Sequence, residues 1–149
     1  MLRMSKHADY GIVLLSYFAG EEAGSLHSAR DLAEAAGLPL PTVSKILKAL
    51  ARGGVLESHL GAHGGYTLSR RPERTSVAAI LQAVEGPIGV TECSPSAEGD
   101  CAFERDCPVR SPLQRLNAVV HQTLERVSLR ELIDPRAPLA PSRPRAMGV

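Results

Sequence analysis

The chain has 149 residues, which suits one domain with an appended segment, since a single hydrophobic core occupies about 100 to 150 residues. Its 44% hydrophobic and 22% charged residues indicate an ordinary globular protein, and the 3% aromatic content leaves Leu, Val, Ile and Ala to fill a core that we expect to be helical. The net charge of +1 is unevenly spread, because basic residues outnumber acidic ones over 40–74 and the reverse holds over 91–110.

The N-terminal stretch MLRMSKHADYGIVLLSYFAG lacks the signals of a membrane or secreted protein. Its apolar run is too short and too interrupted to span a bilayer, and no small-residue cleavage site follows a clean hydrophobic region. We therefore expect a soluble cytoplasmic protein with no membrane partner. The odd number of cysteines, three, argues against a disulfide framework and leaves metal ligation or redox sensing open.

Two helices are predicted before residue 40. Apolar residues recur near helical spacing over 5–19, and Gly20 follows as a stop signal. The second helix should begin at Ser28, whose hydroxyl can cap it, with Asp31 three residues later in a position like that of a capping box. Gly37 should end this helix, because the position after a helix favours a left-handed backbone.

A third, amphipathic helix is predicted over 41–52. Its apolar residues recur at i, i+3, i+4 and i+7, and Pro41 is tolerated in the first turn. Because a tight turn containing Gly37 joins it to the second helix, the pair forms a helix-turn-helix, which places its second helix in the major groove of double-stranded DNA. The polar face of the third helix carries Thr42, Ser44, Lys45, Lys48 and Arg52.

A glycine-rich hairpin is predicted directly after the helix-turn-helix. Two short extended runs, around 55–59 and 66–69, are separated by a loop with Gly61, Gly64 and Gly65 that can reverse the chain. A helix-turn-helix followed by such a hairpin is a winged helix, in which the hairpin tip lies over the DNA backbone or the minor groove.

Two more helices are predicted, one on each side of the cysteines. The first covers 76–85 and ends at Gly86, and the second covers 112–133, with Ser111 as N-cap and Pro112 in its first position. An apolar stripe on such a long helix needs a partner, and pairing with a second copy of the chain would also match a palindromic DNA site. The stripe consists of Leu113, Leu116, Val120, Leu124 and Val127.

The predicted fold class is mainly α with a small β-hairpin. Residues 1–90 form the winged helix-turn-helix DNA-binding domain, 91–111 a cysteine-bearing loop and 112–134 a dimerisation helix. The tail over 135–149, with its prolines and arginines and no apolar periodicity, is expected to be disordered.

All three cysteines lie in the acidic stretch CSPSAEGDCAFERDC. Their spacing, C-x7-C-x5-C, is not that of a zinc ribbon, but a loop rich in Gly, Ser and Asp can bring Cys93, Cys101 and Cys107 to one centre. Thiolates suit either zinc or an iron-sulfur cluster, and the three cysteines alone do not distinguish between these two centres. Three free thiols on a surface loop are the alternative.

Several stretches taken together resemble the IscR/NsrR-type winged-helix iron-sulfur regulators of bacteria, and most closely the subgroup that controls the SUF cluster-assembly operon. The resemblance implies a homodimeric transcription factor, not an enzyme, whose cluster occupancy alters DNA binding, with a 2Fe-2S cluster favoured over a 4Fe-4S one. It extends to about residue 134 and is carried by LRMSKHADYGIVLL, SARDLAEAAGLPLPTVSKILKALARGGVLES, GAHGGYTLSR, SVAAILQAVEGP and the three-cysteine loop, in the family's order and spacing.

The resemblance assigns all three cysteines to the cluster and leaves the fourth ligand open. Arg110 stands where IscR-like regulators have a histidine, and its guanidinium is a poor ligand because it stays protonated. NsrR-like regulators instead use a carboxylate from the first helix of the other subunit, and Asp9 occupies the matching position. An ordinary first-turn acid favoured by the helix dipole is the other interpretation of Asp9, and His7 is a second candidate ligand.

The predicted function is a DNA-binding regulator, expected to repress cluster-assembly genes. The hairpin departs from the family, because Leu60 stands where an arginine is common, and its neighbours His59 and His63 are either DNA contacts or solvated loop histidines. A winged-helix regulator whose cysteines bind zinc or sense oxidants as thiols is the alternative function. The full set of expected DNA contacts is Ser28, Pro41, Thr42, Ser44, Lys45, Lys48, Arg52, His59, His63 and Gly64.

Overall fold

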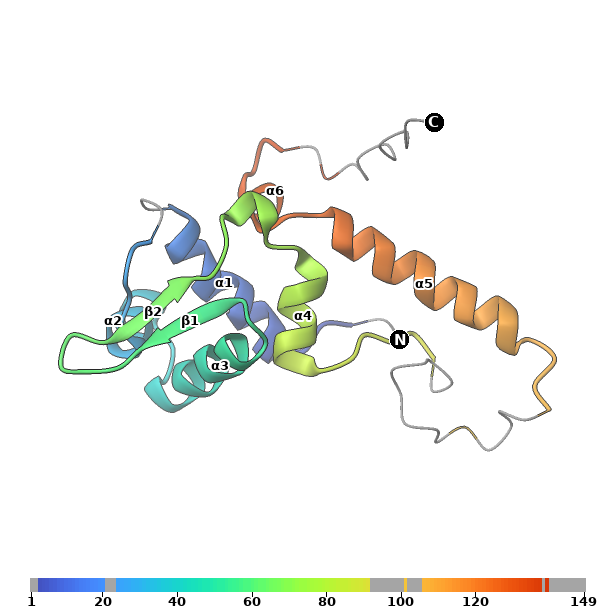
Figure 1. The fold of residues 1–149 in the computed structure, drawn as a ribbon, viewed down its shortest axis with the longest axis horizontal. Coiled ribbons are helices and arrows are strands. Elements are labelled where there is room, and N and C mark those ends of the chain that lie inside the picture. The colour runs from blue at the N-terminus through green and yellow to red at the C-terminus, as the bar shows by residue number, and fades with distance from the viewer. Residues whose placement is uncertain (1–2, 21–23, 92–100, 102–105, 138, 140–149) are drawn as a thin grey trace.

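The computed structural model describes residues 3–20, 24–91, 101, 106–137 and 139. Figure 1 shows a body of short helices and a two-stranded hairpin, from which one long helix, α5, extends, so the expected fold class is confirmed. No helix in this part of the chain is both long and apolar enough to cross a membrane. The elements are α1 (Lys6–Gly20), α2 (Ala29–Ala36), α3 (Leu40–Arg52), β1 (Leu56–His59), β2 (Gly65–Leu68), the 3₁₀ helix η1 (Pro72–Arg74), α4 (Val77–Glu85), α5 (Arg110–Arg126) and α6 (Leu129–Ile133).

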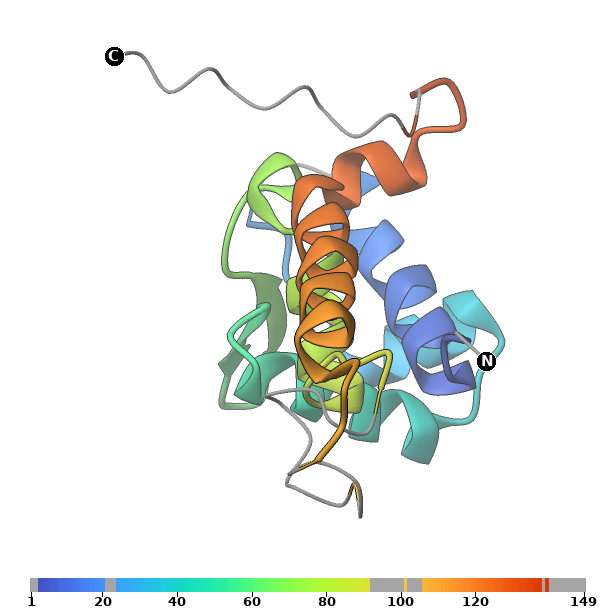
Figure 2. The same cartoon turned by 90° about the vertical axis from the view of Figure 1, so that its right-hand side faces the viewer.

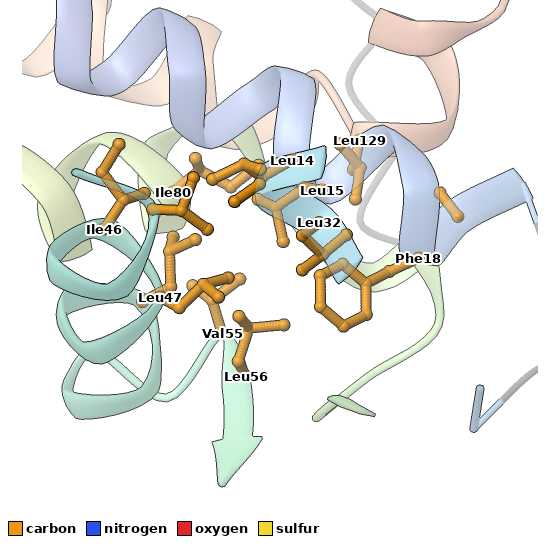
Figure 3. Close-up of a cluster of buried hydrophobic side chains, with 14 residues drawn as sticks. Leu14, Leu15, Phe18, Leu32, Ile46, Leu47, Val55, Leu56, Ile80 and Leu129 are labelled. Atoms are coloured by element: carbon orange, nitrogen blue, oxygen red, sulfur yellow. The ribbon is translucent and has the colours of Figure 1, made fainter. Parts of the chain in front are cut away.

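The larger hydrophobic cluster joins five helices to the base of the hairpin. Its buried side chains are almost all aliphatic, as the low aromatic content requires, and Phe18 is the one aromatic ring among them. Burying each large aliphatic side chain contributes about 1.5–3 kcal/mol, so this cluster fixes how the short helices pack. Figure 3 labels its members Leu14, Leu15, Phe18, Leu32, Ile46, Leu47, Val55, Leu56, Ile80 and Leu129.

The turn between α2 and α3 follows the predicted signals. The Oγ atom of Ser28 accepts a hydrogen bond from the backbone N–H of Asp31 at 3.1 Å and so caps α2. Gly37 ends α2 with a φ of 65°, in the left-handed region that favours glycine. α3 starts at Leu40, one residue before the predicted start, because Pro39 is its N-cap. The turn fixes α3 against α2 and leaves the polar face of α3 exposed.

The hairpin pairs in antiparallel fashion, with His59 opposite Gly65, and a third segment that was not predicted joins it. His27 and Tyr66 exchange two backbone hydrogen bonds, of 3.0 and 2.8 Å. This pairing requires glycine at position 65, because a Cβ atom there would lie 2.5 Å from the carbonyl oxygen of His27. The hairpin is therefore anchored to the segment that leads into α2.

The bounds of the predicted dimerisation helix are wrong at both ends. α5 begins at Arg110, so Ser111 lies inside the helix and does not cap it, and α5 ends at Arg126. Ser128 then caps α6 through a capping box, in which the Glu131 carboxylate accepts a hydrogen bond from the Ser128 N–H at 2.8 Å. This hydrogen bond from the Ser128 backbone, followed by that from its hydroxyl, lowers the pKa of Glu131.

The short helix α6 returns to the core of the winged helix. The N–H of Val77 donates to the carbonyl of Val127 at 2.9 Å, and the N–H of Leu129 donates to the carbonyl of Thr75 at 2.7 Å. These bonds turn the chain between α5 and α6, and they place Leu129, which is fully buried, in the larger cluster. The end of the predicted dimerisation helix thus completes the core that carries α3.

The apolar stripe predicted for pairing with a second copy is divided between two faces of the structure. Leu124 and Val127 pack in a second cluster with Ala8 of α1 and with α4, so part of the stripe faces the chain's own body. Figure 1 shows the C-terminal end of α5 beside α4 and the rest of α5 extending away from the body, and in Figure 2 α5 stands in front of α4. Leu116 is 47% exposed, and Val119, which is not in the predicted stripe, is 59% exposed.

Candidate nucleic-acid interface and metal centre

α3 presents one apolar and one polar face, as the sequence predicts. The apolar side chains at helical spacing are buried in the larger cluster, which fixes the rotation of the helix about its axis. The side chains of the predicted contacts Pro41, Lys45, Lys48 and Arg52 are exposed, whereas those of Thr42 and Ser44 are half-buried.

The basic side chains of α3 share a hollow with the hairpin. It is lined by Lys45, Lys48 and Arg52 together with Ser58 of β1 and Tyr66 of β2. Three exposed cationic side chains along one face of α3, beside the hairpin, suit the phosphate groups of a nucleic-acid backbone, which accept hydrogen bonds and carry negative charge. Ser58 and Tyr66 were not predicted as site residues. They stand opposite each other in the hairpin register, a relation that depends on the turn length.

The tip of the hairpin is shaped by glycine and exposes one apolar side chain. Leu60 is 97% exposed, and Gly61 has a φ of 117°. Gly64 allows a close approach of the backbone, since a Cβ atom there would lie 2.3 Å from the carbonyl oxygen of His59. Both His59 and His63 are exposed, and the Nε2 atom of His59 lies 2.9 Å from the Thr67 Oγ1 atom, so the His59 imidazole is hydrogen-bonded across the hairpin.

We expect Lys48→Ala to weaken DNA binding by about the same factor for every sequence and to lower the salt slope of log K by about one unit. The reason is that an ammonium group facing a phosphate releases a counterion on binding and reads no base. Fluorescence anisotropy with labelled duplexes over a range of salt concentrations measures both quantities. Lys6→Ala, an exposed lysine on α1, is the matched control. Equal slopes for Lys48→Ala and the unmodified chain would rule out the phosphate contact.

The structure places two of the three cysteines. Cys101 and Cys107 are half-buried free thiols, and Cys93 lies outside the described residues. Within the described ranges, no three His, Cys, Asp or Glu side chains lie close enough together to hold a metal ion. The three-cysteine centre therefore stays a prediction, supported by the soft-donor chemistry of the two placed thiols, of which Cys107 lies just before α5.

Asp9 and His7, the candidates for the fourth ligand, lie near the start of α1. Both side chains are exposed, and Asp9 occupies the first turn of the helix. The start of α1 is tied to the end of α4 by a hydrogen bond of 2.6 Å from the backbone N–H of Ser5 to the Glu85 carboxylate. Asp9 is thus accessible to another chain, on a helix held firmly against α4.

Arg110, which the resemblance noted in the sequence places at the position of a histidine ligand, begins α5. Its backbone N–H donates to the carbonyl of Cys107 at 3.3 Å, which joins the last cysteine to the first turn of the helix.

The sequence profile of the Rrf2 family, described as an iron-dependent transcriptional regulator, matches residues 4–135. The HTH-type transcriptional regulator NsrR of Shouchella clausii is 23% identical over 132 residues, which cover 89% of each chain. The structure of CymR, the global cysteine regulator of B. subtilis, is similar with a TM-score of 0.65 at 24% identity, over 89% of this chain and 96% of that one. IscR of T. potens is similar with a TM-score of 0.57 at 22% identity, over 88% and 85% of the two chains.

Proposed function

The chain belongs to the Rrf2 family of transcriptional regulators, and we propose that it acts as a homodimer that represses iron-sulfur cluster assembly (SUF) genes according to cluster occupancy. In this proposal the side chains of Cys93, Cys101 and Cys107 would hold a 2Fe-2S cluster, and the partner's Asp9 would complete it. When bound, the cluster would supply an oxidant-sensitive centre whose presence or loss reports the supply of iron and sulfide.

The observation that carries the proposal is the path from the cysteine segment to the basic face of α3. The segment leads directly into α5, and the opposite end of that helix packs against α1 and α4 through Leu124 and through Val127, the residue that follows the helix. α1 and α4 also pack against α3 in the larger cluster. In this proposal, a change in the cysteine segment would reach the basic face of α3 through the packing of α5, α4 and α1.

The position of Asp9 supports a ligand that comes from the other subunit. A carboxylate that is exposed on the first turn of α1 is free to reach a second chain, and α1 packs in the same hydrophobic cluster as α3. The palindromic operator follows from the two-fold symmetry of the proposed dimer, because two α3 helices must enter major grooves about one helical turn or a multiple of it apart. A cluster bridged by the partner's Asp9 would set this separation.

Purification of the chain without oxygen tests the proposed function. We expect a brown protein with thiolate-to-iron absorption bands, a Mössbauer spectrum of a two-iron cluster and an operator affinity that differs about tenfold between the cluster-bound and cluster-free forms. A colourless protein that binds zinc or no metal would favour the thiol or zinc function instead. An iron-containing protein with the same operator affinity in both forms would contradict cluster sensing.

Substituting Asp9→Ala should shift the absorption spectrum of the cluster and increase its rate of loss in air, while leaving the fold and the dimer intact. The carboxylate is exposed and makes no packing contact that the fold needs, so its removal should act on the cluster alone. Absorption spectra after timed exposure to air measure the effect, and circular dichroism checks the fold. His7→Ala is the matched control: if His7→Ala labilises the cluster and Asp9→Ala does not, His7 is the fourth ligand.

A further inference from the structure

The inner face of α5 carries a buried polar residue whose role the DNA interface does not explain. Of the residues in α5, Asn117 is the one that is buried, with 7% of its surface exposed, at a position where an amphipathic helix would ordinarily place an apolar side chain. Burying an amide costs about 1–3 kcal/mol when its polar atoms have no partner. The cost is offset here only because the amide is hydrogen-bonded at both ends.

The partners of Asn117 lie on the chain segment that follows α4. The Oδ1 atom of Asn117 accepts a hydrogen bond from the backbone N–H of Val90 at 2.8 Å, and its Nδ2 atom donates to the Thr91 Oγ1 atom at 2.9 Å. Val90 belongs to no helix or strand, and its N–H takes the Asn117 side chain as its partner. An apolar residue at position 117 could fill the same space but would leave this N–H without that bond.

These two hydrogen bonds form a neck, defined here as Val90, Thr91 and Asn117. Thr91 comes two residues before Cys93, and Asn117 lies about two turns into α5, after the last cysteine. All three cysteines therefore lie in the sequence between the two sides of the neck. Holding the ends of a chain segment together lowers the conformational entropy that its residues must lose when they converge on one ligand.

We propose that Asn117 is a positioning residue for the cysteine centre: it holds the chain just before the first cysteine against α5, and so keeps the two ends of the three-cysteine segment at a fixed separation. This inference rests on the proposed function in assigning the segment to a cluster, although the neck itself exists without one. An amide is suited to the task because it offers one acceptor and one donor at fixed separation, which neither a carboxylate nor an apolar side chain provides.

The neck can be tested in the cluster-free protein by the alkylation of single cysteines. In the reduced protein treated with iodoacetamide, mass spectrometry follows Cys101 and Cys107 separately. We expect Asn117→Leu to raise their rates about five- to tenfold, because it removes two hydrogen bonds that together hold the neck by roughly 1–1.5 kcal/mol. Thr91→Val removes one of the two bonds with little change of volume and should raise the rates by a smaller factor.

Gln82→Leu is the matched control. It removes a different hydrogen bond between α4 and α5, the contact of 3.0 Å between the Gln82 Nε2 and His121 Nε2 atoms, without touching the neck. If Asn117 only supported the packing of α5, Gln82→Leu and Asn117→Leu would raise the alkylation rates alike. If Asn117→Leu unfolds the chain, as circular dichroism would show, Thr91→Val carries the test.

The rate of cluster loss in air separates this inference from the proposed function. Faster alkylation in Asn117→Leu together with faster cluster loss supports both proposals. Faster alkylation of Asn117→Leu in a chain that never binds iron would support the role of the neck and overturn the cluster function. Alkylation and cluster-loss rates equal to those of the unmodified chain, in both Asn117→Leu and Thr91→Val, would overturn the neck and leave the cluster function standing.

Discussion

Replacing Cys107 with alanine is expected to abolish the cluster absorption of the anaerobically purified protein and the difference in operator affinity that depends on it. A methyl group cannot replace a thiolate ligand, and Cys107 adjoins the first turn of α5, where no other cysteine follows. Iron and sulfide analysis, the visible spectrum and operator binding before and after exposure to air measure the loss. Cys93→Ala and Cys101→Ala should behave alike.

Arg110→Ala is the matched control for this loss. Arg110 is hydrogen-bonded through its backbone to Cys107, so its substitution disturbs the same turn without removing a thiol. We expect it to retain the cluster spectrum, since a guanidinium is not a ligand. A Cys107→Ala protein that keeps an unchanged spectrum would show that the three cysteines are not the ligands.

Leu129→Ala should lower the free energy of unfolding by about 2–5 kcal/mol, the cost of a cavity left by a fully buried leucine. The side chain fills the larger cluster from α6, which packs against α1, and the capping box at Ser128 fixes the start of this helix. Denaturation with urea, followed by circular dichroism and fitted to a two-state transition, measures the change.

Leu60→Ala serves as the comparison for Leu129. Its side chain is 97% exposed at the hairpin tip, and its removal should change stability by less than about 0.5 kcal/mol. If Leu129→Ala were as stable as Leu60→Ala, α6 would not be part of the folded core in solution.

Signals that act over a few residues predicted most of the fold. The Ser28 cap, the left-handed Gly37 and the glycines of the hairpin each determine local backbone geometry, and all three features are observed. The break between α5 and α6 was missed, because apolar periodicity continues through Val127 while the turn depends on backbone pairing with Thr75, some fifty residues earlier in the chain. The capping box at Ser128 was the local signal that could have revealed it.

The candidate site was predictable to the extent that it lies on one helix. Periodicity alone identified the exposed basic residues of α3, whose rotation is set by its own apolar face. Ser58 and Tyr66 were missed, because their place beside α3 depends on the hairpin register and on the pairing of Tyr66 with His27. Asn117 was missed for another reason: a polar residue within a helical pattern gives no sign in the sequence that it is buried.

The packing of α6 in the core also limits which segments of such a protein can be exchanged between chains. A chimera that joins residues 1–90 to a different sensor would leave the core without Leu129 and the start of α4 without its backbone pairing to Val127. We therefore do not expect residues 1–90 to fold as an independent DNA-binding unit. Exchange of sensing chemistry, in the laboratory or in evolution, is expected to proceed by replacing the insert between Thr91 and Arg110, with the chain on both sides retained.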